Sequence, residues 1–117
     1  MEHEEVTARI FSLDEAGRLL PRVKAVTTDA VTGVEVLSAQ IQALPTTHPT
    51  RARVSAELEQ AIRAWTREIH EMGLECKGLW LVDFDNGEGY YCWCYPEETI
   101  AHFHGYDEGF AGRMKIV

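Results

Sequence analysis

The chain contains few cysteines and few basic residues, and it lacks any long apolar run. Its three cysteines are odd in number and lack the spacing of a disulfide framework, so we expect reduced thiols and a cytoplasmic location. Eleven basic side chains against 19 acidic ones give a formal net charge of −8. This charge disfavours nucleic-acid binding, because phosphate contacts need clustered lysine and arginine. No stretch approaches the ~20 apolar residues that span a bilayer, and the acidic start lacks the layout of a signal peptide, so we predict no membrane association.

The length of 117 residues predicts a single domain over residues 1–117. Apolar periodicity divides it into a helical hairpin over 11–73 and a β-rich part over 77–117, which comprises a β-hairpin or sheet and a Gly-rich C-terminal tail. The β-rich part holds two of the three cysteines and two of the five histidines. We therefore expect any functional site to lie there.

The first helix is predicted to begin after Ser12, which forms a capping box with Glu15. Apolar residues then recur in steps of four and three, with Thr27 filling one gap, as expected of a helix that packs along another helix. These residues are Ala16, Leu20, Val23, Ala30, Val34, Leu37, Ile41 and Leu44. Pro21 interrupts the pattern and predicts either one kinked helix or a break into two helices. Ala30 and Gly33 are small enough to permit the close approach of a partner helix.

A turn is predicted at 45–49, because its two prolines and two threonines cannot continue a helix. The four-three pattern then resumes and stops at Gly73. The apolar residues of this second helix are Val54, Leu58, Ile62, Trp65, Ile69 and Met72. The two helices should form an antiparallel hairpin. Two helices bury only one seam, so the remaining apolar surface must contact the β-rich part or a second copy of the chain, and we expect a homodimer.

Two strands are predicted over 79–84 and 90–95, which are rich in aromatic and branched residues. The residues between them include Asn86-Gly87, the favoured two-residue turn of a β-hairpin. A turn centred there places Asp83 opposite Tyr90. The sequence thus predicts both a hairpin and its register.

A third strand is predicted over 99–104, after a turn at 96–98. With three residues in that turn, Tyr90 faces His104, and Cys92 faces His102. Alternation then predicts one face to lie on the helices and a second, mixed face. The first face carries Trp80, Val82, Phe84, Tyr91, Trp93, Ala101 and Phe103. The second carries Leu79, Leu81, Asp83, Tyr90, Cys92, Cys94, Ile100, His102 and His104.

The mixed face predicts one candidate metal site. Cys92 and Cys94 share one side of a strand, as do His102 and His104, and opposed strand positions lie ~5 Å apart. Such a set matches the sulfur and nitrogen ligands of zinc, so the cofactor expected here is a divalent transition metal. The alternative is that both cysteines are small buried apolar residues without a ligand.

A second candidate site is an acid–base centre around His104, Asp107 and Glu97. Asp107 follows His104 closely enough to orient its ring as a general base, or simply to cap the turn. Cysteine nucleophiles are disfavoured, because Cys92 and Cys94 lie near carboxylates that oppose thiolate formation.

Arg113 follows a Gly-rich stretch, and acidic candidates surround it. Its expected role is a bidentate bridge to Asp107, Glu97 or Asp83 that holds the tail. The functional alternative is an anchor for a substrate carboxylate or phosphate.

Several blocks along the chain resemble the DUF2203 family of uncharacterised small bacterial and archaeal proteins. The blocks are Phe11-Ser12-Leu13-Asp14-Glu15-Ala16, Leu19-Leu20-Pro21, Lys77-Gly78-Leu79, Val82-Asp83-Phe84, Cys92-Trp93, Glu97, Ile100, His104, Asp107 and Gly109-Phe110-Ala111-Gly112-Arg113. The resemblance implies a shared polar set of Asp83, Cys92, Trp93, Glu97, His104, Asp107 and Arg113. Cys94 and His102 depart from the family pattern, which carries arginine and an aromatic residue there. The family supplies no activity.

The sequence therefore predicts an α+β fold in which a long antiparallel helical hairpin packs on a small antiparallel sheet of about three strands. The candidate polar site is Asp83, Cys92, Glu97, His104, Asp107 and Arg113. The function we expect is a non-enzymatic assembly or interaction module whose polar cluster locks the C-terminal tail. The alternative is a zinc, iron or manganese site, or an acid–base hydrolytic site, built around His104, Asp107 and Glu97.

Overall fold

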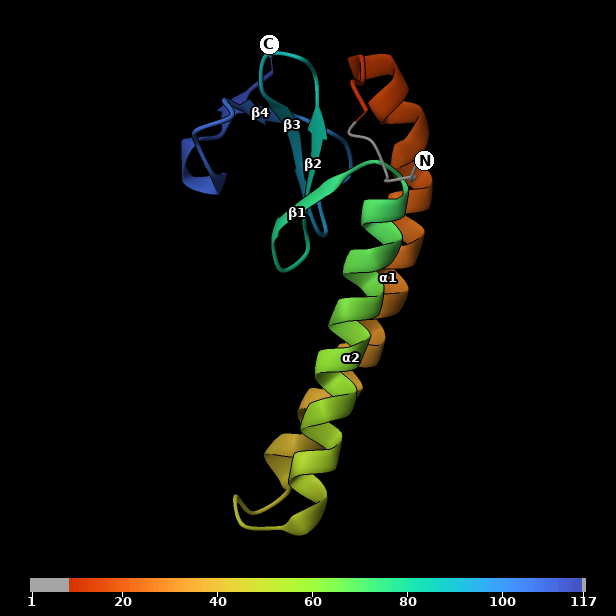
Figure 1. The fold of residues 1–117 in the computed structure, drawn as a ribbon, viewed down its shortest axis with the longest axis vertical. Helices are drawn as coiled ribbons and strands as arrows, with labels where there is room; N and C mark the ends of the chain where they lie inside the picture. Colours follow the sequence, from red (N-terminus) through yellow and green to blue (C-terminus); the bar gives the residue numbers. More distant parts are fainter. Residues whose placement is uncertain (1–8, 117) are drawn as a thin grey trace, which may run out of the picture.

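The computed structural model of the chain describes residues 9–116. Two helices precede a sheet in the order α1 (Leu13–Ala43), α2 (Pro49–Glu71), β1 (Glu75–Gly78), β2 (Leu81–Asp85), β3 (Tyr90–Cys94), β4 (His102–His104), the 3-10 helix η1 (Phe110–Gly112) and β5 (Met114–Lys115). The strands form one antiparallel sheet in the order β1-β2-β3-β4-β5. The predicted α+β fold is confirmed, with five strands rather than about three. The sheet lies beside the half of the hairpin that contains the start of α1 and the end of α2 (Figure 1).

Helix α1 begins at the predicted capping box. The backbone N–H of Glu15 donates to the Ser12 hydroxyl at 3.1 Å, and the N–H of Ser12 donates to the Glu15 carboxylate at 2.9 Å. Pro21 lies inside the helix, which continues without a break to Ala43. Of the two predicted alternatives, the structure therefore has the single helix.

Helix α2 begins one residue before the predicted start. The Nδ1 atom of His48 accepts the N–H of Thr50 at 3.1 Å, and Pro49 occupies the first turn, where its missing N–H costs nothing. The helix stops before Gly73, whose φ of +85° is readily adopted only by glycine. Among the described residues, neither α2 nor α1 is apolar over enough of its length to cross a membrane.

The predicted register between β2 and β3 is wrong by two residues. Asp83 lies opposite Cys92 instead of Tyr90, because the connecting loop has four residues, 86–89. Side chains stabilise this wider loop: the Asp85 carboxylate accepts the N–H of Gly87, and the Asn86 side chain accepts the next N–H, both at 2.9 Å. A shift of two residues leaves each side chain on its predicted face.

The third predicted strand is confirmed in register but is shorter. Tyr90 pairs with His104 and Cys92 pairs with His102, as expected, although β4 begins only at His102. Ile100 was predicted on the mixed face. It precedes the strand and packs against the hydrophobic core instead.

Strands β1 and β5 were not predicted. Strand β1 has the sequence Glu-Cys-Lys-Gly, which lacks branched and aromatic residues, and β5 has only two residues. Leu79 and Trp80 were predicted to start a strand, but they form the turn between β1 and β2, with Trp80 at a φ of 63°. Both missed strands bring charged residues beside the mixed face.

The core lies between the hairpin and the helix-facing side of the sheet. Its buried members are Phe11, Ala16, Leu20, Val23, Trp65, Ile69, Met72, Leu74, Val82, Phe84 and Trp93. The predicted face supplies Val82, Phe84 and Trp93, with Trp80 and Tyr91 partly buried against them. Because residues alternate along each strand, Asp83 and Cys92 point to the opposite side of the sheet.

Candidate functional site

The sheet face turned away from the helices carries a polar cluster, which we call the outer cluster: Asp83, Cys92, Glu97, His104 and Arg113. Asp83, Cys92 and His104 come from β2, β3 and β4, and each is at most 2% exposed. Arg113 reaches them from the loop between η1 and β5. The C-terminal segment thus contributes to covering this face.

Asp83 and His104 form a buried pair. The Nδ1 atom of His104 lies 2.9 Å from the carbonyl oxygen of Gly105, and its Nε2 atom lies 3.1 and 3.2 Å from the two carboxylate oxygens of Asp83. A carbonyl oxygen only accepts, so Nδ1 carries a proton and donates it. The contact between Nε2 and the carboxylate is a hydrogen bond only with one further proton between the two groups, and with that proton the pair has no net charge. This neutrality makes its burial tolerable.

Cys92 lies beside this pair as a protonated thiol. Burial raises the pKa of Cys92 to about 12, with a further contribution from the charge of Asp83. The Arg113 side chain donates to the Cys92 sulfur at 3.9 Å and opposes the shift only in part. Burial likewise raises the pKa of Cys94 and brings that of Cys76 to about 12. The sequence-based expectation of poor cysteine nucleophiles agrees with these environments.

Glu97 and Arg113 form the bidentate bridge expected of the tail arginine. The two guanidinium nitrogens donate to the two carboxylate oxygens at 3.1 and 2.7 Å, and the backbone N–H of Cys94 donates to the same carboxylate at 2.8 Å. Burial acts to raise the pKa of Glu97, but the hydrogen bonds from Arg113 and Cys94 outweigh it, so this pKa lies below its ordinary value of 4.5. The same bridge raises the pKa of Arg113.

We expect the Glu97–Arg113 bridge to lose its stabilising effect in acid. A carboxyl group whose pKa is lowered by folding stabilises the protein above its unfolded pKa, and this contribution disappears as the pH falls through the folded pKa. Glu97→Gln should therefore lower the free energy of unfolding by about 1–3 kcal/mol at pH 7, and by progressively less below pH 4.5. Urea unfolding of wild type and variant at pH 7 and at a pH below 4.5 measures this difference.

Glu98→Gln is the matched control, because the Glu98 side chain is 93% exposed and lies 3.8 Å from Lys24. Its cost should stay below about 1 kcal/mol at either pH. A cost for Glu97→Gln that is the same at neutral and acidic pH would contradict the role of its ionised carboxylate.

The acid–base centre predicted around His104 is not assembled. Asp83, rather than Asp107, contacts the His104 ring, and Asp107 is exposed. Asp107 is only three residues from His104 in sequence, but Asp83 of β2, which is separated from β4 by β3, occupies the position beside Nε2. Glu97, the third predicted member, is bound to Arg113.

Only two of the four predicted zinc ligands come together. Cys92 and His104 lie with Asp83 so that one ligand atom of each is within 4.8 Å of the other two, and within residues 9–116 no other such group of three forms. The thiol of Cys94 points to the backbone oxygen of Tyr95 at 3.4 Å. The Nδ1 atom of His102 lies 3.8 Å from the Glu97 carboxylate. The third member of the group is thus Asp83, and neither Cys94 nor His102 belongs to it.

Sequence reasoning missed the polar residues that β1 adds beside the outer cluster. The hydroxyl of Tyr90 donates to the Glu75 carboxylate at 3.2 Å, and the Lys77 ammonium lies 4.3 Å from the centre of the Tyr90 ring. Tyr106 donates to Asp85 at 2.6 Å, which raises the pKa of Tyr106 to about 12. The contacts of Glu75 and Lys77 depend on the pairing of β1 with β2. The sequence of β1 contains no motif that would have predicted this strand.

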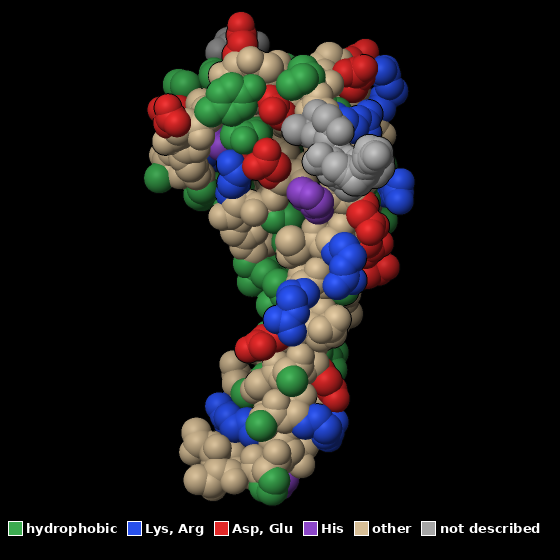
Figure 2. Space-filling view, viewed as in Figure 1, with side chains coloured by type: hydrophobic (Ala, Val, Ile, Leu, Met, Phe, Trp, Pro, Cys, Tyr) green, Lys and Arg blue, Asp and Glu red, His purple; other side chains and the backbone are tan. Residues whose placement is uncertain are grey.

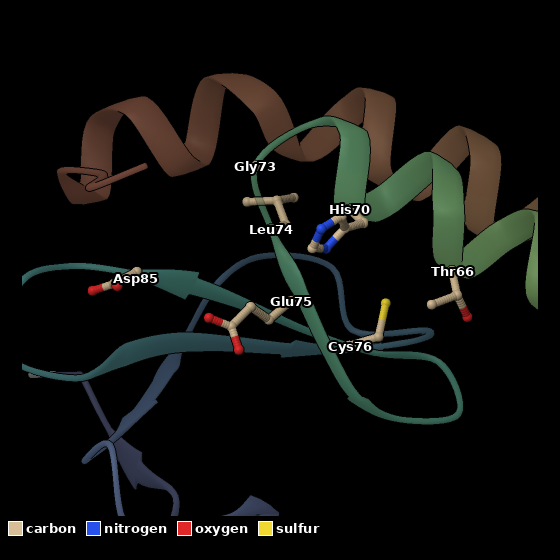
Figure 3. A pocket seen from close by; sticks show the side chains of 7 residues that line it. All are labelled: Thr66, His70, Gly73, Leu74, Glu75, Cys76 and Asp85. Carbon is tan, nitrogen blue, oxygen red and sulfur yellow. The ribbon is translucent and has the colours of Figure 1, made fainter. Parts of the chain in front are cut away.

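A separate pocket of about 250 Å³ lies between the end of α2 and β1 (Figure 3). Its lining residues are Thr66, His70, Gly73, Leu74, Glu75, Cys76 and Asp85. Although this set includes a histidine, a cysteine and two carboxylates, its side chains point from separate elements and do not converge on one point (Figure 3). We therefore place the candidate site at the outer cluster.

Comparison with protein-family models matches residues 9–116 to the family described as "Uncharacterized conserved protein (DUF2203)". Neither the comparison with curated proteins nor the comparison with solved structures finds a match. The matched range covers nearly the whole chain, including the helical hairpin, the sheet and the Gly-rich tail. The resemblance seen in the sequence blocks is confirmed, and the chain belongs to the DUF2203 family.

Proposed function

We propose that this protein is a non-enzymatic assembly module that forms a homodimer through the distal half of its helical hairpin. The distal half comprises 30–43 of α1 and 49–62 of α2. The Glu97–Arg113 bridge locks the C-terminal tail on the sheet, so that the hairpin projects from a rigid base. Three features of the hairpin support this proposal: its shape, the partial burial of its apolar residues and the distribution of its charged side chains.

The first support is the shape of the chain. Its radius of gyration is 16.5 Å, whereas a compact chain of this length has about 13 Å. The excess comes from the hairpin, whose distal half extends beyond the sheet as a narrow arm (Figures 1 and 2). A two-helix arm has too little depth to bury both of its apolar stripes completely.

The second support is the incomplete burial of the heptad-like stripe. Near the sheet, Leu20, Val23, Trp65 and Ile69 are buried. In the distal half, Val31 and Val54 are buried between the two helices, but most of the apolar positions are only partly buried. These are Val34, Leu37, Ile41, Leu58 and Ile62. Val36 is 54% exposed. Apolar residues thus extend along the hairpin beyond the part that the sheet covers. This observation supports the proposal most directly.

The third support is the uneven charge of the two helices. Within the distal half, residues 30–43 of α1 include one charged side chain, Glu35, whereas residues 49–62 of α2 include four. Charged side chains line the visible face of the arm, where α2 lies in front (Figure 2). The cores of protein interfaces are depleted in charge, so α1 is the helix suited to contact a partner.

A second copy of the chain is the occupant that fits this face. Two hairpins that pack α1 against α1 form a four-helix bundle with twofold symmetry and bury both stripes. Gly33 fits such a contact, since no heavy atom lies within 4 Å of the position that its Cβ would occupy. Within one chain, this glycine lowers the stability of the helix by about 1 kcal/mol relative to alanine. In a dimer, the absence of a side chain at this position would let the two α1 helices approach closely.

We expect Val36→Glu to convert a dimer into a monomer. A carboxylate in an apolar interface loses its hydration without gaining a partner, a penalty of several kcal/mol. Size-exclusion chromatography with light scattering, over a dilution series, measures the molar mass directly. The wild type should have twice the mass of one chain, and the variant should have the mass of one chain.

Ala56→Glu is the matched control, because Ala56 is exposed on the charged helix α2. This variant should remain dimeric, and circular dichroism should show that both variants keep their helices. A monomeric wild type would contradict the homodimer. Equal masses for the two variants would contradict the assignment of the interface to α1.

The same proposal places the protein in the cytoplasm, where its three free cysteines would stay reduced. The acid–base alternative lacks a free base, because both ring nitrogens of His104 already have partners and Glu97 is engaged by Arg113. The assembly role requires no such group. It uses the outer cluster only to hold the sheet and the tail together.

A further inference from the structure

We propose that Asp83, Cys92 and His104 bind a divalent transition metal ion, and that zinc matches their donor atoms best. This site is independent of the proposed dimer, because it lies on the outer face of the sheet rather than on the hairpin. The donors are a carboxylate oxygen, a thiolate sulfur and an imidazole nitrogen. This combination suits zinc and related transition metals, whereas magnesium and calcium prefer oxygen ligands.

The three donors converge from three neighbouring strands. One ligand atom of each residue lies within 4.8 Å of the other two, and the side chains are 1–2% exposed. Asp83 is directly opposite Cys92 in the β2–β3 pairing, and His104 reaches them from β4. Because paired strands hold these positions, the site needs no rearrangement of the backbone to gather its ligands.

The histidine is oriented as a metal ligand would be. Its Nδ1 atom donates to the carbonyl oxygen of Gly105 at 2.9 Å, which leaves Nε2 facing Asp83. Histidine ligands in metal sites commonly donate their second nitrogen to a backbone carbonyl or carboxylate in this way. The carbonyl of Gly105 therefore fixes the nitrogen that would contact the ion.

The spacing between Asp83 and His104 is suited to an ion. Nε2 lies 3.1 and 3.2 Å from the two carboxylate oxygens, which is longer than the about 2.7–2.9 Å of a charge-assisted hydrogen bond. The nearby Arg113–Glu97 pair reaches 2.7 Å. Two ligands on a tetrahedral zinc ion lie about 3.3 Å apart, so the observed spacing is close to that of two ligands on one metal.

The charges also balance when a divalent cation is bound. The Asp83 carboxylate and the Cys92 thiolate contribute two negative charges, and a neutral His104 contributes none, so the occupied site has no net charge. Binding releases two protons, the thiol proton of Cys92 and the proton held between Nε2 and the carboxylate. Arg113 donates to the Cys92 sulfur at 3.9 Å and would support the thiolate. Three protein ligands leave one position of a tetrahedral ion for water.

The test uses cobalt(II) as a spectroscopic probe for zinc. Protein stripped of metal with a chelator is titrated with cobalt chloride, and the near-ultraviolet absorption that arises from a thiolate bound to cobalt is recorded. We expect this absorption to saturate at one cobalt per chain and to vanish when zinc is added. Zinc should also raise the thermal midpoint of the stripped protein, because a ligand that binds only the folded state stabilises it.

Cys92→Ser and Cys94→Ser form the matched pair of variants. The first should lose both the absorption and the thermal shift, while the second should keep them, because the Cys94 thiol points to the backbone of Tyr95. Circular dichroism checks that both variants fold. An absence of cobalt–thiolate absorption in the wild type would overturn the proposal, as would its persistence in Cys92→Ser or its loss in Cys94→Ser.

Discussion

Replacing Asp83 with alanine should lower the free energy of unfolding of the metal-free protein by about 3–5 kcal/mol. The side chains of Asp83 and His104 are 1% and 2% exposed, so neither can recover hydration from solvent. Removing the carboxylate leaves Nε2 of His104 buried without its partner. A folded protein of this size has about 5–15 kcal/mol of stability in total, so the variant should be near the limit of folding.

Urea unfolding followed by circular dichroism measures this effect, with wild type and variants at one concentration because dimerisation adds to apparent stability. The controls are His104→Leu and the double variant. A buried ionic pair loses most when one partner is left alone, and much less when both are replaced by apolar side chains. The double variant should therefore be clearly more stable than the sum of the two single losses predicts.

If the losses of unfolding free energy in the two single variants simply add in the double variant, Asp83 and His104 do not stabilise one another. A loss below about 1 kcal/mol for Asp83→Ala would likewise contradict the buried pair, since such a value is typical of exposed ion pairs. The measurement differs from the cobalt titration, because it reports on the protein without metal. The pair can be essential for stability whether or not an ion binds there.

The helical part of the fold was predictable because its signals are local. A capping box at Ser12 and an apolar residue every three or four positions predict a helix without reference to the rest of the fold. Gly73 likewise marks the end of the second helix. The effect of Pro21 was less certain from sequence, since a helix can continue past a proline when its backbone adjusts. Nothing in the sequence alone decided between the kinked helix and the break.

The sheet was only partly predictable because strand pairing depends on distant contacts. Asn86-Gly87 indicated the hairpin correctly, but the loop has four residues, stabilised by backbone N–H groups that donate to the side chains of Asp85 and Asn86, and the register is shifted by two residues. Strand β1 has no residue pattern of its own and forms because β2 offers a free edge. For β4, however, the assumption of a three-residue turn at 96–98 placed His102 and His104 opposite Cys92 and Tyr90, as observed.

The members of the candidate site could be recognised in the sequence, but their partners could not. Asp83, Cys92, His104, Glu97 and Arg113 were all named from the sequence, partly by residue type and as a set by the resemblance to the DUF2203 family. Proximity along the chain then suggested Asp107 as the partner of His104, whereas the actual partner is 21 residues away. For Arg113 three carboxylates were equally reasonable, and only the three-dimensional fold selects Glu97.

A second large effect is expected for Trp65→Ala, at about 3–5 kcal/mol. Trp65 joins three parts of the molecule. It lies on α2, its indole N–H donates to the Thr27 hydroxyl of α1 at 2.9 Å, and its ring lies 4.9 Å from that of Trp80 in the β1–β2 turn. With only 2% of Trp65 exposed, alanine leaves a cavity that the surrounding elements cannot easily close.

Two further variants separate the packing of Trp65 from its hydrogen bond. Thr27→Val keeps the shape of the buried threonine but leaves the indole N–H without an acceptor, which should cost about 1–3 kcal/mol. Trp65→Phe removes that donor and part of the ring. Combining it with Thr27→Val should cost less than the two single changes together, because the double variant has neither member of the hydrogen bond. If Trp65→Ala costs no more than Thr27→Val, the hydrogen bond rather than ring packing joins the hairpin to the sheet.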